Sequence, residues 1–163
     1  MRKNKKRNHQ KHPVPNHKYK DRLFRLVFNN KKDLLDLYNA LNNTCYENPN
    51  DLEVNTLEDA VYLSMKNDIS FLIGGTLNLY EHQSTYNPNM PLRGLIYLAR
   101  LYDGYVETKN INLYSSSLKK LPIPQYFVFY NGTKEQPDET ILQLMDAFES
   151  VSDNRQPCLQ CTA

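Results

Sequence analysis

Two acidic residues, Asp68 and Glu81, are expected to face each other across a β-hairpin. The Cβ atoms of cross-strand neighbours lie about 4.5–5.5 Å apart, and two like charges at that separation destabilise a sheet. A proton shared between the carboxyl groups, exposure of both groups to water at a frayed hairpin end, or a bound cation would each relieve the repulsion. The residues themselves leave these three arrangements open.

The hairpin is predicted from two β-rich runs, 69–73 and 76–80, that flank the pair Gly74-Gly75. A glycine pair between such runs is typical of a two-residue turn of the primed type. This turn fixes which residues of the two strands face each other. The predicted pairs are Leu72 with Leu77, Ser70 with Leu79 and Asp68 with Glu81.

The same register places Gln83 opposite Lys66, on the face that carries the two acids. Successive residues of a strand point to opposite faces, so His82 is expected on the other face. We therefore expect no catalytic role for His82.

The formal net charge of +2 conceals a basic N-terminal arm. Residues 1–20 hold eight lysines and arginines, among them Lys3, Lys5, Lys6 and Arg7, and no acid, whereas the remainder holds 12 basic and 18 acidic residues. Clustered positive charge is typical of nucleic-acid binding, because each contact with a phosphate releases counterions. A solvated, disordered tail of the same composition is the competing interpretation.

A long helix is predicted after the hairpin, from an N-cap at Asn89 to about Val106. The apolar positions of this helix include Leu92, Leu95, Ile96 and Ala99. A separate stripe holds Arg93, Tyr97 and Arg100, and we expect the two arginines either to contact DNA phosphates or to form salt bridges on a solvated face.

Further elements are predicted on both sides of the hairpin. Helical spacing covers 23–28 and continues in a second helix that Asp33 caps and that ends near Leu41. Short strand-like segments follow at 52–57 and 60–65. Beyond the long helix, Tyr126 to Tyr130 is predicted to be a buried strand, and Glu139 to Val151 a further helix.

The composition favours one domain in the cytoplasm. A chain of 163 residues that is 40% hydrophobic can close a single core. It has no run of roughly 20 apolar residues that would cross a membrane, and Pro13 and Asn16 stand where a signal peptide would be apolar. Three cysteines form no disulfide framework, which is consistent with a reducing compartment.

The run from Glu81 to Arg93 reads Glu-His-Gln-Ser-Thr-Tyr-Asn-Pro-Asn-Met-Pro-Leu-Arg and is long and distinctive. Together with the run from Lys66 to Phe71, it resembles the recombination-promoting nuclease family of the PD-(D/E)XK superfamily. The similarity covers nearly everything beyond the basic arm. It also includes Tyr19-Lys20-Asp21, Phe24, Phe28, Asn39-Ala40-Leu41, residues 121–132 and Asp146-Ala147-Phe148.

The resemblance implies an α/β fold with a restriction-endonuclease-like core, in which a small mixed sheet with a central hairpin, 68–83, is flanked by helices. It also implies cleavage of DNA with Mg²⁺ or Mn²⁺, with Asp68 and Glu81 as metal ligands and Asp21 completing the site. Gln83 matches the position of the family's lysine. Residues 1–20 are then an arm and 21–163 the nuclease-like domain, and a double-strand cut by so small a domain favours a homodimer.

Two departures from the family pattern bear on activity. Gln83 cannot supply the positive charge of a lysine, and we hypothesise that Lys66, opposite it, restores that charge. Relatives continue past Asp146-Ala147-Phe148, so the chain is expected to be a C-terminally truncated copy. The alternatives to a nuclease are an inactive DNA-binding or self-associating remnant and a purely structural domain.

Overall fold

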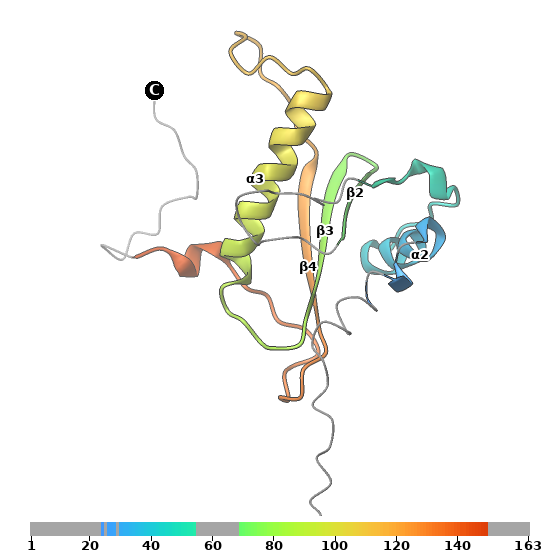
Figure 1. Ribbon diagram of the computed structural model, residues 1–163, viewed down its shortest axis with the longest axis vertical. Coiled ribbons are helices and arrows are strands. Elements are labelled where there is room, and N and C mark those ends of the chain that lie inside the picture. Colours follow the sequence, from blue (N-terminus) through green and yellow to red (C-terminus); the bar gives the residue numbers. More distant parts are fainter. Residues whose placement is uncertain (1–23, 25, 29, 55–68, 150–163) are drawn as a thin grey trace, which may run out of the picture.

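The computed structural model describes residues 24, 26–28, 30–54 and 69–149, and in this part of the chain a four-stranded sheet lies between helices (Figure 1). The strand order is β1-β2-β3-β4, antiparallel except for the parallel pair β3 and β4. The prediction of an α/β fold with a small mixed sheet and a central hairpin is therefore confirmed. The strands are β1 (Glu53–Val54), β2 (Ile69–Ile73), β3 (Thr76–Gln83) and β4 (Ile123–Tyr130), and the helical elements are α2 (Lys31–Asn42), α3 (Met90–Thr108) and the 3₁₀ turns η1 (Pro49–Asp51) and η2 (Leu144–Ala147).

The hairpin of β2 and β3 has the predicted turn and register. Gly74 and Gly75 have φ angles of 56° and 82°. Two consecutive positive φ angles are what a primed turn requires, and glycine adopts them without strain. Both predicted pairs that lie in the described part are present, Leu72 with Leu77 and Ser70 with Leu79.

Helix α2 covers one face of the sheet (Figure 1). Asn30 caps this helix by accepting a hydrogen bond from the Lys32 backbone N–H, so the prediction that Asp33 is the cap was wrong. The cap lies earlier because Asp33 already has helical neighbours on both sides. The buried core on this face consists of Leu34, Leu35, Tyr38, Leu52, Ile69, Phe71, Ile73 and Tyr80.

Helix α3 packs on the opposite face, where Leu77, Leu79, Tyr97 and Leu101 form a second core (Figure 1). A solvated face is one of the two predictions for the stripe of Arg93, Tyr97 and Arg100, but Tyr97 is buried against the sheet, whereas Leu92 is exposed. The stripe of Arg93, Tyr97 and Arg100 therefore lies toward the sheet. Apolar residues occur almost all round the helix, so their spacing alone did not identify the packed side.

Strand β4 pairs in parallel with β3, and α3 forms the crossover connection that parallel strands require. The predicted strand is present, but its residues from Gln125 to Tyr130 are half-buried rather than buried. In the described sheet β4 is an edge strand. This position also accommodates Pro124. Proline has no backbone N–H, and an edge strand tolerates this because one of its sides has no neighbouring strand to bond.

The helix predicted from Glu139 to Val151 was wrong over its described part. Only η2 is helical there, as a single 3₁₀ turn. Ile141 and Phe148 are 80% and 55% exposed and Leu142 and Met145 are only half-buried, so the apolar residues at helical spacing do not form a buried stripe. Without such burial a short helix is marginal in water.

Several predicted elements lie partly or wholly outside the described residues. They include the basic arm, residues 23 and 25 of the segment 23–28, and the strand-like segment 60–65. Of the segment 52–57, the structure describes only 52–54, where β1 is formed. Neither α2 nor α3 combines the length and apolar character that crossing a membrane demands, and no other helix of the described part does so.

Candidate functional site

Glu81 lies on the central strand β3, with its side chain on the face covered by α3. Its side chain is only 2% exposed, which is rare for a carboxylate unless it is paired. Arg93 of α3 supplies such a pairing, with 3.3 Å between its Nη2 atom and Glu81 Oε2. Helix α3 therefore places a positive charge next to the buried carboxylate of Glu81.

The guanidinium of Arg93 is held by more than Glu81. The Nη2 atom also donates a hydrogen bond of 3.0 Å to the Tyr97 hydroxyl, and the guanidinium carbon lies 5.7 Å from the centre of the Tyr97 ring. Burial acts to lower the pKa of Arg93, but the hydrogen bond to Tyr97 and the nearby Glu81 carboxylate outweigh it, and the pKa is raised. Arg93 therefore remains a fixed cation beside Glu81.

The second predicted acid, Asp68, lies outside the described residues, as do Lys66 and Asp21. The described ladder ends at Ile69, which pairs with Tyr80. That Asp68 faces Glu81, and that Lys66 faces Gln83, therefore stay predictions. Within the described ranges, no three His, Cys, Asp or Glu side chains gather as they would around a metal ion.

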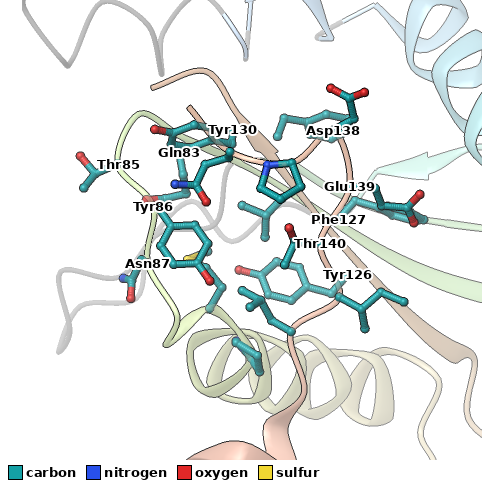
Figure 2. Close-up of a pocket in the computed structure, with 18 residues that line it drawn as sticks. Gln83, Thr85, Tyr86, Asn87, Tyr126, Phe127, Tyr130, Asp138, Glu139 and Thr140 are labelled. Carbon is teal, nitrogen blue, oxygen red and sulfur yellow. The ribbon is translucent and has the colours of Figure 1, made fainter. Parts of the chain in front are cut away.

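Gln83 is the last residue of β3 and lies on the same face as Glu81. Its carbonyl oxygen accepts a hydrogen bond of 3.0 Å from the Asn131 backbone N–H, which fixes the end of the strand. The half-buried side chain lines a pocket of about 760 Å³ (Figure 2). The predicted helper residue is thus next to a space large enough for a ligand.

We call this space the tyrosine pocket, because Tyr86, Tyr126 and Tyr130 are among its lining residues. Tyr86 comes from the loop after β3, and the other two tyrosines come from β4. The segment 136–142 closes the opposite side (Figure 2). Sequence reasoning missed the pocket because that segment was predicted to begin a helix.

His82 lies on the face of the sheet opposite Glu81, as predicted. It is 6% exposed, and its ring centre is 5.7 Å from that of Phe24. The ring thus packs in the layer beneath α2, away from Glu81 and the tyrosine pocket.

Arg100 lies two turns beyond Arg93 on α3. It lines a small cavity of about 170 Å³ together with Glu53 and Tyr105. Its Nη1 atom is buried and has no hydrogen-bond acceptor among the described residues. Arg93 and Arg100 therefore occupy two separate surroundings, and their predicted contacts with DNA phosphates stay predictions, as do those of Lys3, Lys5, Lys6 and Arg7, which lie outside the described residues.

The pairing of Glu81 with Arg93 was not predicted. Both residues belong to the same distinctive run, but twelve positions separate them. A signal was available in the alternation of β3, which puts Glu81 on the same face as Leu77 and Leu79, where the following helix must pack. Burial of a charged acid at that position is costly unless a basic residue of the helix pairs with it.

Comparisons with known proteins identify no relative of this chain. No protein-family model, no curated protein and no solved structure matches it. What the chain does must therefore be inferred from its own residues.

Proposed function

We propose that this chain is a metal-dependent DNA endonuclease of the recombination-promoting nuclease family, built on a restriction-endonuclease-like core. The observation that carries the proposal is the buried carboxylate of Glu81 on the central strand of a small mixed sheet, with a cation fixed beside it. A buried acid with a tightly controlled charge environment is a frequent feature of catalytic sites. The sequence resemblance supports the same assignment.

The oxygen ligands that the described residues offer are compatible with Mg²⁺ or Mn²⁺. Both ions prefer oxygen ligands, and Mg²⁺ is typically held by one or two carboxylates together with substrate phosphate oxygens. Glu81 supplies a carboxylate and Gln83 an amide oxygen on the same face of β3. In the proposed site Glu81 and Asp68 hold the ion, and Asp21 completes the set. When bound, the metal lowers the pKa of a water molecule and offsets negative charge at the phosphate.

The residues of the chain have distinct tasks in this proposal. Glu81 holds its carboxylate in place through the contact with Arg93, so that little reorganisation accompanies ligand binding. Arg93 provides positive charge close to the phosphate that is cut, which compensates for the missing lysine at Gln83. Gln83 orients the attacking water through its side-chain amide. Lys66 remains a second proposed source of charge.

Binding of the metal at Glu81 can be tested by thermal denaturation. Mg²⁺ or Mn²⁺ should raise the melting temperature of the wild type, because a ligand that binds the folded state stabilises it. The rise should be absent in Glu81→Gln, which keeps the size of the side chain and removes its charge. An equal rise in both proteins would place the metal elsewhere and contradict the proposed ligand.

A second candidate function is that of an inactive DNA-binding remnant. It is favoured by the pairing of Glu81 with Arg93, because the guanidinium satisfies the acid without a metal. This candidate predicts DNA binding that weakens steeply with salt, without cleavage in Mg²⁺ or Mn²⁺. Strong binding together with metal-dependent cleavage would exclude it.

A further inference from the structure

The tyrosine pocket has the lining of a site for a flat, polar aromatic ring. In Figure 2 the hydroxyl groups of Tyr86 and Tyr126 point toward each other across the space, and the amide of Gln83 lies nearby. Tyr86 is 40% exposed, so its ring is accessible from solvent. Aromatic side chains of this kind stack on nucleobases, and each stacked base contributes substantially to affinity.

The polar groups of the pocket can form hydrogen bonds with the edge of such a ring. Gln83 and Asn87 both line the pocket and carry side-chain amides, which offer a donor and an acceptor together. Asp138 and Glu139 also line the pocket, but both residues are exposed, and in Figure 2 their carboxylates point away from the amides and the tyrosine hydroxyls. Side-chain amides of this kind pair with adenine through its exocyclic amino group.

The lining of the pocket suits a base better than a phosphate. Among the described residues that line it, none is lysine, arginine or histidine, so a phosphate would find no positive charge there. A neutral base finds tyrosine rings on which it can stack. The lining therefore favours the base inside the pocket and the backbone phosphate outside it.

The position of the pocket relative to Glu81 suggests where that phosphate lies. Gln83 lines the pocket and is two residues from Glu81 on the same face of β3, a separation of about 7 Å along a strand. Arg93, the fixed cation, contacts Glu81. A nucleotide with its base among the tyrosines would place its phosphate toward Arg93, whose side chain is 27% exposed.

We propose that the tyrosine pocket receives an unpaired nucleobase with an exocyclic amino group, from the DNA strand on which the nuclease site acts. The inference rests on the proposed function for the identity of the strand. Enzymes that act on nucleic acid often take a base out of the stack into such a pocket. The base would then fix the position of the strand before the phosphodiester bond is cut.

Base binding can be measured without metal and without cleavage. The full-length protein is titrated in EDTA against a short single-stranded oligonucleotide with 2-aminopurine at its centre, whose fluorescence falls when the base stacks on an aromatic ring. An oligonucleotide with an abasic site at that position serves as a competitor with the same phosphates. The wild type should quench the fluorescence, and the abasic competitor should be much weaker than the oligonucleotide with the base.

Variants test whether the base occupies this pocket. Tyr86→Ala should weaken binding about tenfold or more, as expected for the loss of one stacking partner. Tyr114→Ala is the matched control, because Tyr114 is fully exposed and is not among the lining residues. Thr140→Tyr fills the pocket from the opposite wall and should weaken binding in the same way. Unchanged affinity in Tyr86→Ala and Thr140→Tyr, or equal competition by the abasic oligonucleotide, would overturn the proposal.

The same assay separates failure of the pocket from failure of the nuclease. The fluorescence change in EDTA requires neither a metal ion nor cleavage, so it reports on the pocket alone. If the base binds as proposed but no metal-dependent cleavage occurs, the pocket stands and the nuclease is refuted. If cleavage occurs and Tyr86→Ala binds as the wild type does, only the pocket is refuted. Binding of free cytidine or adenosine without binding of the oligonucleotide would overturn the assignment to a DNA strand.

Discussion

Removal of Arg93 should destabilise the protein, because the buried carboxylate of Glu81 then loses its contact with the Arg93 guanidinium. At the observed 3.3 Å, two unit charges attract by about 5 kcal/mol at an effective dielectric constant near 20. The cost of desolvation offsets part of this gain, and breaking a fully buried pair typically costs about 3–5 kcal/mol. The Arg93 side chain is 27% exposed and Glu81 only 2%, so water screens one partner. We expect Arg93→Ala to lower the free energy of unfolding by about 3 kcal/mol.

Urea denaturation measures this change directly, and thermal denaturation should show a fall of about 6–12 °C in melting temperature for a chain of this length. Arg100→Ala is the matched control, because Arg100 lies on the same helix and no described acid forms an ion pair with it. The double variant Arg93→Ala/Glu81→Gln should lose less stability than the sum of the two single changes, because both partners of one ion pair are removed together. If the two single changes simply add, the charge coupling proposed here is refuted.

Three further predictions concern the packing, the alkaline stability and the arm. Gly94→Ala should lower the free energy of unfolding by about 1–3 kcal/mol in a urea titration, because a Cβ there would lie 2.5 Å from the Tyr126 ring. Gly104→Ala is the control and should be neutral or stabilising, because there is open space around Gly104. Burial raises the pKa of Tyr80, so the folded state keeps a proton that the unfolded chain loses above a pH of about 10; stability should fall as pH rises beyond that value, and less steeply in Tyr80→Phe. An equally steep fall in Tyr80→Phe would contradict this. Replacement of Lys3, Lys5, Lys6 and Arg7 by glutamine should reduce the slope of log K against log salt for duplex DNA by about 3–4, and an unchanged slope would show that the arm does not contact phosphate.

The hairpin was predictable because its signals are local. A glycine pair imposes a turn, the turn imposes a register, and the register decides which side chains share a face. The position of Glu81 and Gln83 on one face and of His82 on the other follows from that register alone. The parallel pairing of β4 with β3 does not, because it depends on how the crossover helix packs.

The features that the sequence did not predict depend on tertiary contacts. Arg93 lies toward the sheet on α3, where it pairs with Glu81 and donates a hydrogen bond to the buried Tyr97, and Gly94 leaves room for Tyr126. Helical periodicity is judged from apolar residues, so it did not identify Arg93 as a residue of the packed face. The segment 139–149 has helical spacing but forms only the 3₁₀ turn η2, while its residues 139–142 line the tyrosine pocket.

Incubation of the full-length protein with supercoiled plasmid tests the proposed nuclease most directly. Reactions with Mg²⁺ or Mn²⁺ are compared with a chelator control, and Glu81→Gln is assayed alongside the wild type after both are shown to be folded. The nuclease proposal predicts nicked or linear plasmid with the wild type and metal, and none with the chelator or with Glu81→Gln. Intact plasmid with a folded wild type that still binds DNA, or equal nicking by both proteins, would contradict it.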